Sequence, residues 1–154
     1  MRSSAPASAV LVRLAVGCIF ASEGIQKFLF PELLGAGRFA RIGLPAPEVL
    51  GPFVGGVEVV CGALVLVGLL TRVASFFLLA VISVAIASTK IPVLLGHGYL
   101  TFALPRLTRY GFWSMASEAR TDFAMLCGTL FLVLAGAGSL SLDALFRAGR
   151  PAPE

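Results

Sequence analysis

The feature that most constrains this chain is the length of its uninterrupted apolar runs. Residues 73–95 open with VASFFLLAVISVAIAS and contain one charged residue, Lys90. A bilayer core about 30 Å thick is crossed by about 20 helical residues rising 1.5 Å each. The run also lacks the period-two alternation of a half-buried strand. It therefore predicts a membrane-spanning helix.

Composition extends this conclusion to the whole chain. Of 154 residues, 58% are hydrophobic and 13% are charged, whereas about a quarter of the residues of a typical soluble domain are charged. The mean hydropathy is +0.95, so the chain contains more apolar side chains than a small soluble domain can bury. The chain is predicted to be an integral membrane protein whose main partner is the lipid bilayer.

Four apolar runs have about the length of a span. They predict an all-α, integral membrane four-helix bundle that forms a single domain over residues 1–154, with a disordered tail from about residue 147. A signal peptide is the alternative for the first run, but that run is long, carries Arg13 and has no clear cleavage site. The predicted spans are residues 10–30, 52–70, 73–95 and 122–138.

Four crossings place both termini and the tight turn at residues 69–72 on one side of the membrane. The long connections, residues 31–52 and 96–120, then lie on the other side. Arginines are almost evenly divided between the two sides, so the positive-inside rule does not decide the orientation. The working expectation is a multi-pass protein of the bacterial plasma membrane with both termini in the cytoplasm.

Five ionisable residues fall within or at the ends of these spans, in the half nearer the long connections. A charge at a helix centre costs about 2.5–3.5 kcal/mol on insertion scales, so these side chains are expected to face one another rather than lipid. They are predicted to form one polar cluster. Its members are Glu23, Lys27, Glu58, Lys90 and Asp122.

Spacing suggests how the cluster is paired. Glu23 and Lys27 stand four residues apart with the acid first, which favours an ion pair within one helix. Glu58 and Lys90 are the expected partners between helices, and Asp122 is available to either lysine. Gly51, Gly55 and Gly62 share a helix face with Glu58 and favour close helix contacts, either within one chain or between chains of a homo-oligomer.

This cluster has two explanations. Buried ion pairs sometimes serve only to fix the register of packed helices, and Lys27 alone has the length to extend its amine to the headgroups. Intramembrane charges more often mark a path or site for a substrate, proton or ligand, and this cluster lies near one aqueous face. A ligand-binding pocket lined by the five residues is the favoured interpretation.

Other chemistries find little support in the sequence. Three single cysteines on three spans favour apolar packing over redox exchange, and His97 has no neighbouring metal ligand, so no metal site is predicted. Nothing predicts a nucleic-acid partner, and the net charge of +4 suits anionic lipid better. Aromatic residues between positions 99 and 113 suit a belt at headgroup level.

Three stretches carry a resemblance to a known family. They are EGIQKF at residues 23–28, VGGVEVVCGALVLVGLLTR at residues 54–72 and GAGSLSLDAL at residues 136–145. From about residue 11 to residue 146 the chain resembles the DoxX family of small bacterial four-helix membrane proteins. Glu23, Lys27, Glu58, Arg72 and Asp143 match its recurring polar positions, but the family offers no agreed catalytic residue to carry over.

The resemblance implies a plasma-membrane protein, since some relatives act as membrane subunits of quinone-linked sulfur oxidoreductases and others belong to oxidative-stress complexes. The favoured hypothesis is a membrane subunit or binding protein of an oxidoreductase system. Its pocket would take a small amphipathic ligand such as quinone, with Glu58 or Glu23 handling protons.

No intrinsic cofactor motif appears, so any redox cofactor would belong to a soluble or membrane-bound partner. The alternative is a non-catalytic scaffold whose ion network is purely structural. A permeation pathway is disfavoured because the opposite half of the membrane offers almost no polar residues besides Arg13.

Overall fold

The computed structural model describes residues 6–148, which form seven helices and no β-strand. The all-α prediction is confirmed. In chain order the helices are α1 (Ala9–Leu29), α2 (Ala36–Ile42), α3 (Pro47–Val67), α4 (Thr71–Leu95), α5 (Phe112–Glu118), α6 (Arg120–Ala135) and α7 (Leu142–Ala148). Within the described residues, α1, α3 and α4 are long and apolar enough to cross a membrane. Helix α6 has 16 residues, so a fourth crossing remains a prediction.

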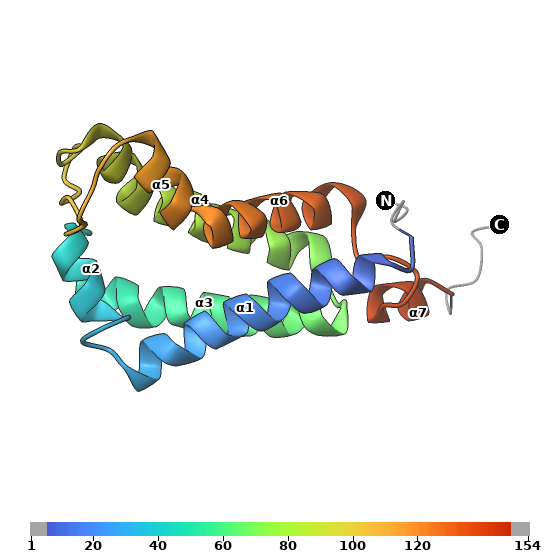
Figure 1. The fold of residues 1–154 in the computed structure, drawn as a ribbon. Helices are drawn as coiled ribbons and strands as arrows, with labels where there is room; N and C mark the ends of the chain where they lie inside the picture. Colours follow the sequence, from blue (N-terminus) through green and yellow to red (C-terminus); the bar gives the residue numbers. More distant parts are fainter. Residues whose placement is uncertain (1–5, 149–154) are drawn as a thin grey trace.

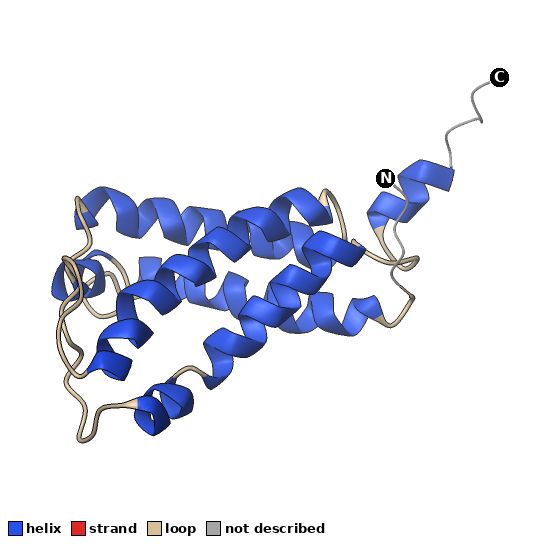
Figure 2. Cartoon of the chain, turned by 90° about the horizontal axis from the view of Figure 1, so that it is seen from above, coloured by secondary structure: helices blue, strands red, loops and turns tan. Residues whose placement is uncertain are grey.

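The long helices are arranged as two pairs, α1 with α3 and α4 with α6, which lie side by side (Figure 1). Helices α2 and α5 and residues 96–111 gather at one end, which we call the loop end. The start of α1, residues 68–70 and α7 lie at the opposite end, which we call the turn end. Figure 2 shows the bundle from above, with its helices joined by loops and no strand among the described residues.

Glycine and proline set the helix ends. Helix α3 starts at Pro47, five residues before the expected start of the second span, since proline suits the first turn of a helix. It stops at Gly68, whose left-handed backbone (φ 73°) lets its N–H bond to the carbonyl of Leu64 at 2.9 Å. Helix α6 ends before Gly136, three residues before the expected limit of the fourth span.

The tail expected from about residue 147 overlaps the end of α7 by two residues. Residues 147 and 148 belong to the last turn of α7, and the rest of that tail lies outside the described residues. Helix α7 is anchored to the turn between α3 and α4, since the N–H of Asp143 donates to the carbonyl of Gly68 at 2.9 Å.

Glycines explain the close approach of α1 and α3. A Cβ added at Gly24 would lie 2.6 Å from the carbonyl oxygen of Gly55, and one at Gly62 would lie 3.0 Å from that of Gly17. Gly55 was expected to support helix contacts either within one chain or between chains. The structure shows a contact within the chain. Small residues on both faces let the two backbones come into contact. Close packing of this kind drives helix association in lipid, where the hydrophobic effect does not favour contact between helices.

The core lies where the two helix pairs meet. Large apolar side chains cover the outer helix surfaces, as expected for faces that contact acyl chains. The buried cluster contains Val16, Phe20, Cys61, Val65, Ala74, Leu78, Ile82, Met125 and Leu132.

Candidate functional site: a polar cavity at the loop end

Three of the five predicted residues form a triad between α1 and α3. The Nζ of Lys27 lies 2.6 Å from Oε2 of Glu58 and 3.8 Å from Oε2 of Glu23. The side chains of Lys27 and Glu58 are 8% and 5% exposed, whereas that of Glu23 is 47% exposed. The short pair therefore lies between the helices, and Glu23 is a weaker, peripheral member.

The structure pairs Glu58 with Lys27 instead of with Lys90. Because α3 starts at Pro47, Glu58 stands eleven residues into the helix, about 16 Å from its start. It is therefore deeper than expected. The α1–α3 glycine contact brings Lys27 to that depth, and Lys90 on α4 has a different partner.

That partner is Asp122, in the first turn of α6. Its Oδ2 lies 3.0 Å from the Nζ of Lys90, and the two side chains are 24% and 13% exposed. This pair joins α4 to α6 as the triad joins α1 to α3. The predicted single cluster is thus two separate ion-pair groups, one in each helix pair.

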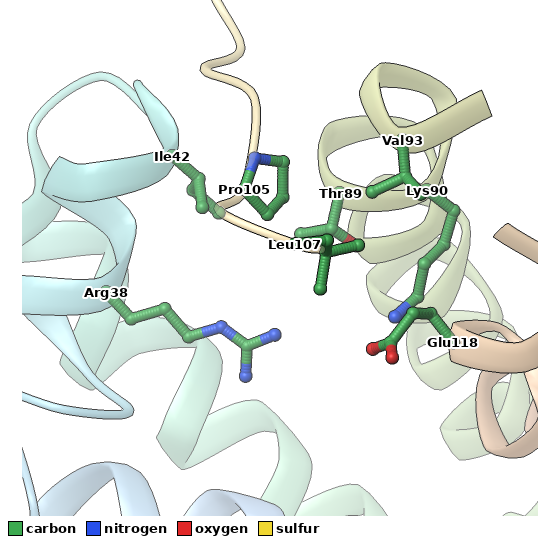
Figure 3. A pocket seen from close by; sticks show the side chains of 8 residues that line it. All are labelled: Arg38, Ile42, Thr89, Lys90, Val93, Pro105, Leu107 and Glu118. Atoms are coloured by element: carbon green, nitrogen blue, oxygen red, sulfur yellow. The ribbon is translucent and has the colours of Figure 1, made fainter. Parts of the chain in front are cut away.

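A cavity of about 150 Å³ opens beside the second group, at the loop end. Helices α2, α4 and α5 and the connection between α4 and α5 supply its walls (Figure 3). Apolar side chains form much of the lining, and Lys90 is the single member of the predicted five to reach it. The lining residues are Arg38, Ile42, Thr89, Lys90, Val93, Pro105, Leu107 and Glu118.

Hydrogen bonds hold the loop wall of the cavity in place. The hydroxyl of Tyr110 donates to the carbonyl of Pro105 at 3.1 Å and accepts from the N–H of Leu107 at 3.2 Å. The N–H of Gly111 donates to the carbonyl of Val93, and that of Ala103 to the carbonyl of Ile42. The connection is thereby tied to both α4 and α2, which gives the cavity a defined shape.

The charges around the cavity differ in their partners. Lys90 is paired with Asp122, whereas Arg38 and Glu118 make no hydrogen bond or ion pair with any residue in the range 6–148. Figure 3 shows the guanidinium of Arg38 reaching in from α2 and the side chains of Lys90 and Glu118 from the opposite wall. The cavity therefore presents an unused donor and an unused acceptor, and four of its eight lining residues are apolar.

Sequence reasoning missed Arg38, Tyr110 and Glu118 as parts of a site. A signal for Arg38 exists, because it precedes Arg41 by three residues in a connection that lies at the same end as Lys90. Glu118 and Tyr110 belong to a connection whose pattern is not periodic. Their placement depends on how that connection folds over α4.

A second polar group occupies the turn end. Arg13 is 3% exposed, and its guanidinium donates to the carbonyls of Val65 (2.9 Å), Leu66 (2.6 Å), Ala137 (3.3 Å) and Leu140. Two of these acceptors lie in the last turn of α3 and two in the segment after α6, so the guanidinium joins the end of α3 to that segment. A cation at the carboxyl end of α3 also suits the helix dipole.

Asp143 completes the turn end. Its carboxylate accepts from the backbone N–H groups of Leu70 at 2.9 Å and Thr71 at 3.1 Å. These groups open α4, so the aspartate caps that helix from a distant part of the chain. Polar groups at this end thus satisfy helix termini.

No group of three potential metal ligands lies together in the part of the chain that the structure describes. The cavity residues instead suit an organic head group. Arginine and lysine donate to acceptor oxygens, a carboxylate accepts from a hydroxyl, and the apolar wall accommodates a ring.

A helical bundle with three apolar helices of spanning length and charges gathered between helices defines an α-helical integral membrane protein. Residues 8–91 match the DoxX family. The match covers more than half of the chain, which therefore belongs to that family.

One relative extends the match beyond those residues. An uncharacterized membrane protein of Mycobacterium tuberculosis, Rv3486, is 48% identical over 143 residues, which cover 93% of this chain and 83% of the relative. No solved structure matches the chain.

Proposed function

We propose that this DoxX-family membrane protein binds the head of a small amphipathic molecule in the loop-end cavity, as the membrane component of an oxidoreductase system. Quinone is the candidate ligand. The single observation that carries the proposal is the cavity itself, which combines apolar walls with Arg38, Lys90 and Glu118.

The size of the cavity supports a ring-sized head. An engineered apolar protein cavity of about 150 Å³ accommodates one benzene molecule, and the loop-end cavity has a volume of about 150 Å³. A benzoquinone ring fits this class, with its oxygens near the polar side chains. A long isoprenoid tail does not fit and would remain in the acyl chains.

The location also supports an amphipathic ligand. Lys90 stands five residues before the end of α4, about 7 Å along the helix, while Glu118 and Arg38 belong to short helices at that end. A molecule held here keeps its head at the membrane boundary and its tail in lipid. A redox partner carrying its own cofactor would meet the head from the aqueous side.

The assignment of roles differs from the one expected from sequence. Glu58 is almost fully buried and held by Lys27, so we assign the triad to helix packing. Glu118 and Asp122 are the carboxylates beside the cavity, and they are the proposed acceptors for a hydroxyl proton of the head in its reduced, quinol form. Glu23, Lys27 and Glu58 become control positions.

The test is organic extraction and mass spectrometry of the full chain purified from its native membrane in mild detergent. Leu107→Trp fills the cavity without changing a charge, and Leu33→Trp makes the same change at a position that is 65% exposed. We expect one quinone per chain in the wild type and in Leu33→Trp, and loss of it in Leu107→Trp.

Two results would contradict the proposal. Equal quinone in all three proteins would place the ligand elsewhere, and bulk lipid alone in all three would favour the scaffold alternative. Glu58→Gln, prepared in parallel, is expected to retain the ligand despite a lower Tm, because the triad lies outside the cavity wall.

A further inference from the structure

We infer that Arg38 selects the ligand of the loop-end cavity by donating to an acceptor oxygen of its head, either a quinone carbonyl or the oxygen of an anionic head group. The inference rests on the proposed function for the identity of the site, and it adds the chemical class of head that the site accepts.

The first step is a comparison of two arginines on α2. Arg41 donates to the carbonyl of Glu32 at 2.8 Å and to that of Leu33 at 2.9 Å, so it fixes the preceding loop. Arg38 lines the cavity and makes no hydrogen bond or ion pair with the residues described. The two arginines are three residues apart on one short helix. The donors of Arg41 are used within the fold, whereas those of Arg38 are available to a ligand.

The second step concerns the other charges of the cavity. Lys90 is already paired with Asp122 at 3.0 Å, so its charge is largely offset. Arg38 is the remaining cation, and a guanidinium presents five N–H donors in a planar fork. A head with one or two acceptor oxygens matches this fork. A cationic head would be repelled by Arg38 and attracted only by Glu118 on the opposite wall.

A structural role is the competing explanation. Arg38 is near enough to Glu58 to interact with its charge, and the triad contains two acids and one base. Arg38 would then act as a counter-ion of the triad. Such a role would appear in stability and leave ligand affinity untouched.

The experiment is isothermal titration calorimetry of the full chain in mild detergent with three decyl-tailed probes. These are a decyl-substituted benzoquinone, decyl phosphate and decyltrimethylammonium. Each is titrated into wild type, Arg38→Gln, Arg38→Lys and the matched control Arg41→Gln, and partition into micelles cancels between these proteins. Tm is measured for each.

We expect the acceptor-headed probes that bind the wild type to bind Arg38→Gln about tenfold more weakly, which corresponds to about 1.4 kcal/mol, close to the lower limit for a hydrogen bond to a charged group. Arg41→Gln should match the wild type within about twofold, and Arg38→Lys should recover part of the loss. The cationic probe should not bind any of the four proteins through the cavity.

The outcomes separate the two proposals. Binding of decyl phosphate but not of the quinone, with the Arg38 dependence, supports the inference and contradicts quinone as the ligand. Quinone binding that is equal in Arg38→Gln and Arg41→Gln overturns the inference and leaves the proposed function standing. A lowered Tm in Arg38→Gln with unchanged affinity establishes the counter-ion role instead. Failure of both acceptor probes to bind the wild type overturns both.

Discussion

The two ends of the bundle both carry charged side chains, but these side chains have different kinds of partners. At the turn end, Arg13 and Asp143 direct their hydrogen bonds to backbone groups at helix ends. At the loop end, Lys90 pairs with the side chain of Asp122, and Arg38 reaches into a cavity.

Backbone partners cannot be displaced without opening the fold, whereas a cavity can exchange its contents. The turn end is therefore expected to determine stability, and the loop end to determine binding. The triad of Glu23, Lys27 and Glu58 lies between these cases, because its partners are side chains but its short pair is closed off by packing. Substitutions at each place measure the difference.

The largest effect is expected at Arg13. Arg13→Met removes the donor shared by four carbonyl groups, and each buried acceptor left unpaired costs about 1–3 kcal/mol. We expect a loss of more than about 4 kcal/mol, which lowers Tm by about 10 °C or more for a chain of this size. Thermal unfolding followed by circular dichroism measures it.

Arg13→Lys is the matched control for this change. It keeps the charge but offers fewer donors in a different geometry, so an intermediate Tm is expected. A Tm of Arg13→Met within about 3 °C of the wild type would show that the turn end does not depend on this guanidinium.

The next largest effect is expected at Glu58. Glu58→Gln leaves the buried ammonium of Lys27 without its close partner, and breaking a buried pair in this way costs about 3 kcal/mol. Glu23→Gln, on the half-exposed member at 3.8 Å, should cost less than about 0.5 kcal/mol. Thermal unfolding compares the two.

A double substitution tests the cause. Lys27→Met with Glu58→Leu replaces the pair by apolar side chains and should recover most of the lost stability, since the desolvation cost of both charges disappears. Continued instability of the double variant would mean that the two side chains have a role besides pairing with each other.

A smaller effect is expected at the distant cap of α4. Asp143→Ala removes the acceptor of two N–H groups at the start of that helix and should cost about 1–2 kcal/mol. Glu48→Ala is the control, because Glu48 lies in the first turn of α3, where no side-chain cap is formed. Equal Tm values for the two variants would show that the Asp143 carboxylate does not stabilise the start of α4.

Much of the fold could be predicted because bilayer thickness sets helix length and glycine sets helix ends. The run at residues 73–95 gave α4 to within two residues at its start. The α1–α3 contact also had a signal, since Gly55 and Gly62 share a face with Glu58. The exact start of α3 had no such signal. Pro52 looked like a helix boundary, but the structure accommodates it inside the helix.

The site was less predictable for a physical reason. The spacing of Glu23 and Lys27 is local and does give an ion pair, at 3.8 Å, but the partner of Glu58 depends on the depth at which α1 and α3 cross. The cavity depends on Arg38 and Glu118, which come from two connections. Tertiary contacts such as the Tyr110 hydrogen bonds fix the position of these connections relative to each other. That position cannot be predicted from periodicity in the sequence.

At Lys90 a small loss of stability is expected together with a loss of binding. Lys90→Met breaks a pair whose members are both partly exposed, so we expect a loss of about 1 kcal/mol or less. A double-mutant cycle with Asp122→Asn should give a coupling energy well below that of the corresponding Lys27 and Glu58 cycle. The quinone recovered from Lys90→Met should nevertheless fall, because a cavity wall has lost its charge. Equal coupling energies in the two cycles, with the ligand retained, would show that the charges of the loop end serve stability as those of the turn end do. The proposed difference between the two ends would then be wrong.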